Sequence, residues 1–265
     1  MSKFFALSVE KVTKTVTIII SDVIFRRNLK IFIKMLKKNN SLKLIEYYNY
    51  INYNLIYDNK AINRYKKENY EISQDKTKSL ELLKKTIFNI KNCSLKKQAK
   101  NIVFCDGNPK SKIMLIGEAP GANEDEEGLP FVGRAGMLLD KMLAAINLDR
   151  KKVYISNIIN YRPPENRRPT DEEIKRYLPF ITRHIEIIDP KIIVLLGSTA
   201  MNALIGDETV ISKMRGKWIE KKFGNCKTSV LITFHPAFLM RQPAQKKMAW
   251  IDLKMIRDKK NNLKI

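Results

Sequence analysis

Polar side chains follow three apolar runs in this sequence, and their types suit the binding of a polar ligand. The side chains concerned are a carboxylate, an amide and an imidazole, from Glu118, Asn157 and His235. Glu118 lies in the glycine- and proline-rich loop 117–121, and His235 lies in a second cluster, 234–241, just past another apolar run. In open α/β sheets, ligands bind where strand carboxyl ends meet the next helix N-terminus. The spacing therefore predicts that three strand ends line one cleft.

Apolar runs alternate with helical patterns from about residue 87 onward. The strand-like runs are 113–116, 153–157, 192–196 and 229–233, and the helical stretches are about 134–146, 171–188, 198–205 and 243–257. Such alternation indicates parallel β-α units. We expect an α/β fold, a three-layer α/β/α domain with a four-stranded, mostly parallel sheet.

Three short motifs, in order along the chain, carry a resemblance to a known family. They are Gly117-Glu118-Ala119-Pro120-Gly121, Asn157 and His235-Pro236-Ala237, with Arg162-Pro163-Pro164 and Asn166-Arg167 as further matches. At these residues the chain resembles the type-4 uracil-DNA glycosylases of the uracil-DNA glycosylase superfamily, over roughly residues 87 to 257. One short motif is weak evidence, whereas three at suitable separations are specific.

The resemblance implies an enzyme that flips deoxyuridine out of DNA and hydrolyses its N-glycosidic bond, leaving an abasic site. By resemblance, Phe131 stacks on uracil, the Asn157 amide reads the N3 and O4 edge, and His235 donates toward O2. Breaking this bond puts positive charge on the sugar and negative charge on the base, and a flipped base needs stacking and edge hydrogen bonds. The other pocket groups are expected to be the backbone of Gly117, Glu118 and Ala119.

The acidic residues near the first motif are catalytic candidates. Glu118 is assigned to orienting the water or supporting the cationic sugar. Glu124 and Asp125 match the acidic pair that follows the family's first motif. The alternative for residues 124–127 is a solvated charge run near a helix start, where negative charge is favourable.

Structural roles compete with functional ones at several positions. The alternative role for Phe131 is that of a core aromatic residue, and the alternative role for Asn157 is that of a strand-end cap. Of the two histidines, His184 lies in a helical stretch and is assigned a structural or surface role. Leu239 or Met240 is expected either to wedge into the base stack or to pack in the core. The candidate DNA contacts are Leu239, Met240, Arg241, Arg162 and Arg167.

Composition favours nucleic acid as the partner. The chain has 50 Lys and Arg against 27 Asp and Glu, a formal net charge of +23. Such a charge draws a protein toward phosphate backbones in a salt-dependent way. The alternative for part of this excess is a general compositional drift toward Lys, Asn and Ile rather than a binding surface, so the charge is supporting evidence only. We expect uracil-containing DNA as the partner, a monomer, and no membrane association.

The chain divides into an N-terminal extension, residues 1–80, and a catalytic domain, residues 81–265. The extension is basic and rich in Lys, Asn and Tyr, and it carries none of the motifs. Its apolar run 16–20 is far shorter than the roughly 20 residues that span a bilayer. Its tyrosines and lysines either bind single-stranded DNA or form a helical packing segment or a disordered arm.

The cysteines are where this chain departs from the family, whose members usually hold a [4Fe-4S] cluster with four cysteines. Only Cys93 matches a cluster ligand; the other three positions are Ile90, Tyr161 and Tyr177, and Cys105 and Cys226 match none. We therefore expect no cofactor and a former cluster site filled by apolar and aromatic packing. Three scattered cysteines also favour the cytoplasm, without disulfides or zinc.

Two hypotheses of different classes follow. The first is a monofunctional uracil-DNA glycosylase, a hydrolase of N-glycosidic bonds that needs no lysine nucleophile and acts in base excision repair. The second is a catalytically silent DNA-binding or repair-scaffold protein of the same fold. Retention of Glu118, Phe131, Asn157 and His235 together favours the enzyme. A relative that binds uracil-containing DNA covalently is disfavoured, because no extra basic, histidine-bearing loop is present.

Overall fold

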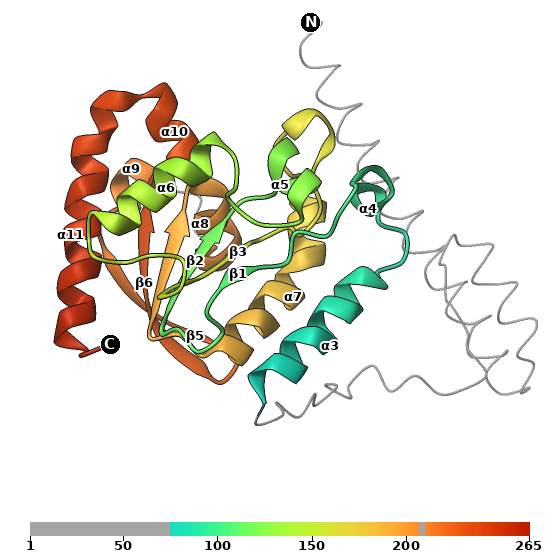
Figure 1. Cartoon of the computed structure of the whole chain (residues 1–265), viewed down its shortest axis with the longest axis horizontal. Helices are drawn as coiled ribbons and strands as arrows, with labels where there is room; N and C mark the ends of the chain where they lie inside the picture. Colours follow the sequence, from blue (N-terminus) through green and yellow to red (C-terminus); the bar gives the residue numbers. More distant parts are fainter. Residues whose placement is uncertain (1–74, 207–209) are drawn as a thin grey trace, which may run out of the picture. The chain divides into compact units, whose positions relative to one another are not determined.

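The computed structural model describes residues 75–206 and 210–265, which form a three-layer α/β/α domain (Figure 1). Most of the expected N-terminal extension, including its apolar run and its tyrosines, lies outside these ranges. The division near residue 80 stays a prediction. Helix α3 (Lys76–Phe88) crosses that position and buries Leu80, Leu83 and Ile87 against the domain core.

The sheet has six strands in the order β1-β3-β2-β4-β6-β5. Its centre consists of β3 (Tyr154–Asn157), β2 (Ile113–Gly117), β4 (Ile192–Leu196) and β6 (Cys226–Thr233), all mutually parallel. The short β1 (Asp106–Gly107) and β5 (Trp218–Phe223) add antiparallel edges. The expected α/β/α class and four parallel strands are confirmed, whereas the expected strand count was two too low.

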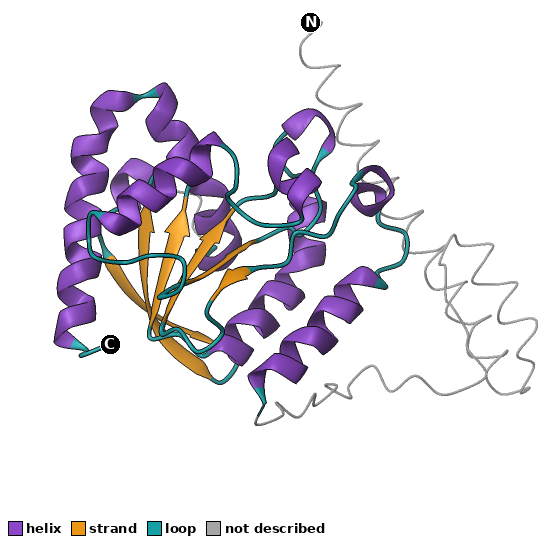
Figure 2. Ribbon diagram, viewed as in Figure 1, coloured by secondary structure: helices purple, strands orange, loops and turns teal. Residues whose placement is uncertain are grey.

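The central strands are apolar because both faces of the sheet are covered by helices (Figure 2). Every residue of β2, β3 and β4 is buried, as is usual for parallel strands between helical layers. Alternate side chains enter two different cores. In β2, Met114 and Ile116 face one core, and Ile113 and Leu115 face the other.

Two sets of helices supply these cores. The first includes α3, α4 (Ser94–Gln98), α7 (Asp171–Ile188) and α8 (Ser198–Ile205); the second includes α6 (Arg134–Ala144), α10 (Pro236–Arg241) and α11 (Lys246–Asn262). Short elements complete the described part: α5 (Ala122–Glu127), α9 (Ile211–Met214) and the 3-10 turns η1 (Pro164–Asn166) and η2 (Pro243–Gln245). No helix in these ranges combines the length and apolar composition needed to cross a bilayer.

Helix starts occur where the sequence offers caps. Thr170 begins α7 with a capping box, because its hydroxyl accepts from the Glu173 N–H while the Glu173 carboxylate accepts from the Thr170 N–H. Helix α11 begins at Lys246, three residues after the expected start, because residues 243–245 form η2. The four parallel strands all end at one edge of the sheet, and the loops that follow β2, β3, β4 and β6 lie together at that edge.

Candidate active site

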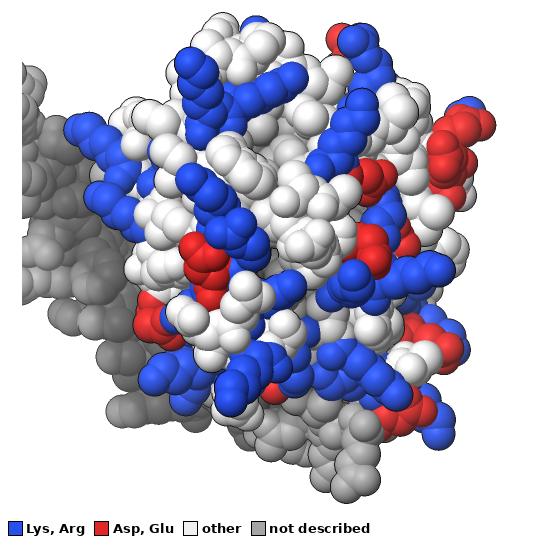
Figure 3. Space-filling view, turned by 60° about the vertical axis from the view of Figure 1, so that its left-hand side comes forward, with Lys and Arg blue, Asp and Glu red and all other residues white. Residues whose placement is uncertain are grey.

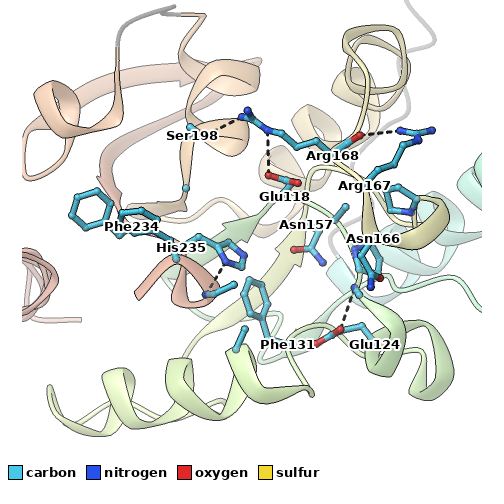
Figure 4. A pocket seen from close by; sticks show the side chains of 18 of the residues that line it. Glu118, Glu124, Phe131, Asn157, Asn166, Arg167, Arg168, Ser198, Phe234 and His235 are labelled. Carbon is cyan, nitrogen blue, oxygen red and sulfur yellow. Dashed lines mark hydrogen bonds and ion pairs between the residues drawn. The ribbon is translucent and has the colours of Figure 1, made fainter. Parts of the chain in front are cut away.

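A cavity of about 650 Å³ lies at the carboxyl ends of β2, β3, β4 and β6 (Figure 4). Each of these ends supplies at least one wall residue, as expected for neighbouring parallel strands. Of the residues selected from sequence, the wall includes Glu118, Ala119, Glu124, Phe131, Asn157, Arg167, His235 and Arg241. The cavity is therefore built from all three motifs.

Phe131 forms an aromatic wall of the cavity, and its backbone is held in an unusual conformation. Its φ is 57°, in the left-handed region that non-glycine residues seldom adopt. The Arg150 side chain donates to the carbonyls of Pro130 and Phe131, and it also pairs with Asp106. The ring centroid lies 5.6 Å from that of His235, at an interplanar angle of 30°. Phe131 and His235 thus line one aromatic side of the cavity.

Asn157 ends β3 with its amide buried beside the Phe131 ring. Its Oδ1 is fully buried and accepts no hydrogen bond within the described part of the chain. A Cβ atom added at Gly117 would lie 2.4 Å from Oδ1 and 2.6 Å from Cζ of Phe131, so only glycine fits there. A buried acceptor without a donor is costly, and a ligand N–H would satisfy it.

His235 is held as a neutral imidazole of one tautomer. Its Nδ1 accepts from the Ala237 N–H at 3.1 Å, so Nδ1 is unprotonated and the ring proton is on Nε2. Although the ring borders the cavity, burial and, to a smaller extent, the charge of Arg241 together lower the pKa of His235 to about 4. At neutral pH, Nε2–H is therefore a neutral donor. Figure 4 shows the His235 ring above that of Phe131.

Glu118 follows β2 and is partly exposed, with its side chain toward α8. Its Oε2 accepts a short hydrogen bond from Oγ1 of Thr199, and Nε of Arg168 is 4.0 Å away (Figure 4). This arrangement holds a carboxylate at the cavity wall opposite the Phe131 ring.

Glu124 and Asp125 are adjacent in sequence but do different things. Glu124 lines the cavity, and its carboxylate accepts from the N–H groups of Gly121 and Gly133 at 3.1 and 2.9 Å. Asp125 does not line the cavity; it is buried and accepts from the N–H groups of Lys100 and Asn101. Both stand in the first turn of α5, where acidic residues are favourable. The contacts of Asp125 favour a structural role over the catalytic one expected from sequence.

The comparisons with known proteins agree with this geometry. A family model described as the uracil DNA glycosylase superfamily matches residues 104–254. The chain belongs to the uracil-DNA glycosylase superfamily. A type-4 uracil-DNA glycosylase of Sulfurisphaera tokodaii is 42% identical over 185 residues, 68% of this chain and 84% of that protein. Another type-4 uracil-DNA glycosylase, from Archaeoglobus fulgidus, is 39% identical over 182 residues, 67% of this chain and 92% of that protein.

More distant superfamily members match less of the chain. A type-5 uracil-DNA glycosylase of Thermus thermophilus is 30% identical over 114 residues, 37% of this chain and 52% of that protein. The matches to type-4 proteins are higher in identity and cover more of this chain than the type-5 match, so within the superfamily the chain groups with the type-4 proteins.

The candidate DNA contacts lie in different environments. Leu239 is 1% exposed and packs in the core, which favours the packing alternative for this residue, while Met240 is partly exposed. Arg241 is exposed at the cavity. Arg162 donates to Asn166, and Arg167 makes a bidentate pair with Glu173 and lowers the pKa of that carboxyl. Arg167 is thus already engaged within the protein.

The residues at the family's cluster positions pack together. Cys93, Tyr161 and Tyr177 are buried in one core cluster, and Ile90 packs against it. Sγ of Cys93 lies 3.4 Å from the Tyr177 hydroxyl, and burial raises the pKa of Tyr161 to about 12. A [4Fe-4S] cluster requires four thiolate-type ligands, and these residues include one thiol. They do not fit such a cluster, and no His, Cys, Asp or Glu group suited to a metal exists in the described ranges.

Three polar residues near the cavity were not selected from the sequence: two that follow β4 and one from the loop between β3 and α7. They are Ser198, Thr199 and Arg168, which are joined by hydrogen bonds. Gly197, with φ of 97°, turns the chain from β4 into α8 and places Ser198 at the cavity. The signal was present, because the rule that selected the other strand ends applies equally to β4.

Proposed function

We propose that this protein is a uracil-DNA glycosylase that flips deoxyuridine from DNA and hydrolyses its N-glycosidic bond, with base excision repair as its role. The observation that carries the proposal is Oδ1 of Asn157, which is buried between the first motif and the Phe131 ring and accepts no hydrogen bond from any residue that the structure describes. It requires a donor, and N3–H of uracil is one. Cytosine presents an acceptor at N3, so the same site disfavours it.

The chemistry then follows from the residues around the base. The bond from C1′ to N1 breaks, and its electrons pass to the uracil ring and O2, where negative charge grows. The neutral Nε2–H of His235 donates to O2 without giving up its proton. Donors fixed in advance at the place where charge develops are an effective catalytic device. Phe131 stacks on the departing base.

Glu118 acts on the sugar side. Its carboxylate stabilises the cationic C1′ and orients the water that attacks it. The water oxygen bonds to C1′, its proton leaves to solvent or to the base, and the products are free uracil and an abasic site. No covalent intermediate with a lysine is needed. The backbone of Ala119 belongs to the same wall, and Gly117 supports it from behind, against Oδ1 of Asn157 and the Phe131 ring.

Basic side chains support uracil-containing DNA as the partner. Figure 3 shows many Lys and Arg side chains and fewer acidic ones on the side where α11 lies. Arg241 stands exposed at the cavity, and Arg162 and Arg167 come from the loop across it. We propose that these three arginines and Met240 contact DNA, in a salt-dependent way. The proposed form is a monomer.

We further propose that the protein works without an iron-sulfur cluster. Cys93, Tyr161, Tyr177 and Ile90 fill that part of the core with their own side chains. The three cysteines are free thiols, which fits a reducing compartment such as the cytoplasm. Purified protein with stoichiometric iron and a broad visible absorbance would overturn this. The proposed division is an extension at 1–80 and a catalytic domain at 81–265.

The test is excision from end-labelled oligonucleotides that carry one uracil, single-stranded or opposite G or A, followed by alkaline cleavage. The expected result is scission only where uracil stands, lost in His235→Ala and in Asn157→Ala. A thymine-containing oligonucleotide and the melting temperature of each variant are the controls. Absence of scission, with salt-sensitive DNA binding that survives both substitutions, would instead support the silent scaffold.

A further inference from the structure

Glu118 and Thr199 meet because their strands are neighbours. β2 and β4 pair in parallel, so Glu118, which follows β2, lies beside the first turn of α8, which follows β4. Thr199 is buried there, and its hydroxyl donates to Oε2 of Glu118. The other carboxylate oxygen, Oε1, makes no hydrogen bond with any described residue. One oxygen is thus held by the protein while the other is available.

Arg168 decides where the threonine proton points. Its Nε and Nη2 donate to Oγ1 of Thr199 at 3.1 and 3.0 Å, and Nη2 also donates to Oγ of Ser198 at 3.0 Å. A guanidinium only donates, so Oγ1 accepts from it and its own hydrogen is directed to Glu118. Figure 4 shows Arg168 reaching from its loop toward both Ser198 and Glu118.

We propose that Thr199 and Arg168 are positioning residues that fix the Glu118 carboxylate for hydrolysis. Thr199 holds Oε2, Arg168 orients the Thr199 hydroxyl, and Oε1 is left to face water and the sugar. The inference rests on the proposed glycosylase function and assigns roles to two residues outside the family's motifs. A rotating carboxylate would spend less time in the productive geometry, so the effect falls on the chemical step rather than on binding.

A second role for Arg168 makes Thr199 the better residue to test. The Arg168 side chain is 63% exposed, so its outer edge is open to a DNA phosphate as well. Thr199 is buried and has no such access. Thr199→Val removes the hydroxyl and keeps the shape, whereas Thr199→Ser keeps the hydroxyl.

The experiment measures single-turnover excision from a uracil-containing oligonucleotide at saturating protein, and the dissociation constant of the same complex. Thr199→Val is expected to lower the rate constant by roughly tenfold to a hundredfold, the range for a hydrogen bond to a charged group, and to leave the dissociation constant unchanged. Thr199→Ser is expected to restore most of the rate. Thr86→Val, an exposed hydroxyl on α3 that donates to Leu82, is the matched control.

Double variants separate positioning from general damage. In a Glu118→Gln background, Thr199→Val is expected to have no further effect, and Arg168→Ala is expected to add little to Thr199→Val. Thr199→Val with the wild-type rate, or with an equal loss in the Glu118→Gln background, would overturn the inference alone. Wild-type protein that excises no uracil would instead refute the proposed function, and this inference with it.

Discussion

At the scale of single residues, the protonation of His235 is fixed by its surroundings. The Ala237 N–H occupies Nδ1, and burial holds the pKa near 4, below its ordinary value of 6.5. We predict that the single-turnover excision rate shows no transition near pH 6.5 and remains level from about pH 9 down to about pH 5.5, because the imidazole stays neutral there.

At lower pH the same rate is expected to fall as His235 gains a second proton near pH 4, since protonated Nδ1 can no longer accept from Ala237. The control is His235→Ala, whose residual rate should lack this acid limb. A rate that falls about threefold between pH 7 and pH 6 in the wild type only would show that His235 titrates with its ordinary pKa.

Gly117 gives a second prediction at this scale. Gly117→Ala would drive a methyl group into Oδ1 of Asn157 and the Phe131 ring, at 2.4 and 2.6 Å. We expect the excision rate to fall by at least about a hundredfold while the protein stays folded. The reason is that the Asn157 amide, which is proposed to bind the uracil edge, is displaced by more than about 0.5 Å. Excision assays and thermal melting measure the two effects.

Gly206→Ala is the matched control for this substitution. Gly206 has a positive φ of 76°, which Gly117 does not have, and a Cβ atom added there would meet nothing within 4 Å. It is expected to lose some stability through backbone strain and to keep its excision rate. Equal losses of excision in the two variants would contradict the steric argument.

The residues with the main polar roles were predictable because each follows an apolar run. Ser198 and Thr199 follow an apolar run in the same way, but the contact of Thr199 and Arg168 with Glu118 was not predictable. That contact depends on strand order and on a loop that returns across the sheet. Asp125 was placed in the site by its position next to Glu124. Neighbours on a helix do not face the same side, so α5 directs Asp125 toward Lys100 and Asn101.

At the scale of elements, α7 is joined to the segment before α4 by the Cys93–Tyr177 contact and by Arg176, which donates to the Asn92 carbonyl. Tyr177 of α7 lies fully buried against Cys93 and Tyr161. We predict that Tyr177→Phe lowers the free energy of unfolding by about 1 kcal/mol, the usual value of one hydrogen bond. Tyr177→Ala should lower it by about 3–5 kcal/mol, because it leaves a large cavity.

Urea denaturation of the purified full-length variants measures the loss in the free energy of unfolding for each substitution. Tyr154→Phe is a useful comparison, because Tyr154 is equally buried and its hydroxyl bonds Nε2 of His184 at 2.6 Å. If Tyr177→Ala cost no more than Tyr177→Phe, packing would not be what joins these elements.

The four parallel strands were predictable because continuous apolar runs are typical of strands covered on both faces. The edge strands lack this pattern. β1 has two residues, and β5 reads Trp-Ile-Glu-Lys-Lys-Phe, with its charged side chains on an edge that is half exposed. Their pairing depends on neighbours that sequence periodicity does not contain. The same limit applies to η2, which delays the start of α11.

At the scale of the whole molecule, buried histidines make stability depend on pH. His184 is stacked on Phe104 and bonded to Tyr154, and burial lowers its pKa to about 3 from an ordinary 6.5. Below pH 6.5 the unfolded chain gains a proton at this residue and the folded chain does not. Stability is therefore full above pH 6.5 and is lost as the pH falls toward 3.

We predict that His184→Gln reduces this acid loss. Glutamine keeps a hydrogen-bonding group near Tyr154 but does not titrate, so the variant should lose about 2 kcal/mol less than the wild type between pH 6.5 and 5. Urea denaturation at each pH measures the difference. Identical pH dependence in the two proteins would mean that His184 is protonated in the folded state.

The carboxylate of Glu124 has a consequence for the speed of recognition. By accepting from Gly121 and Gly133 at once, it closes the segment between β2 and α6 into a ring that includes Phe131. The conformational entropy of this segment is lost when the chain folds, not when a base arrives. Under the proposed function, a flipped nucleotide meets a preformed surface. Its capture is then governed by how fast it leaves the DNA duplex rather than by closure of this segment.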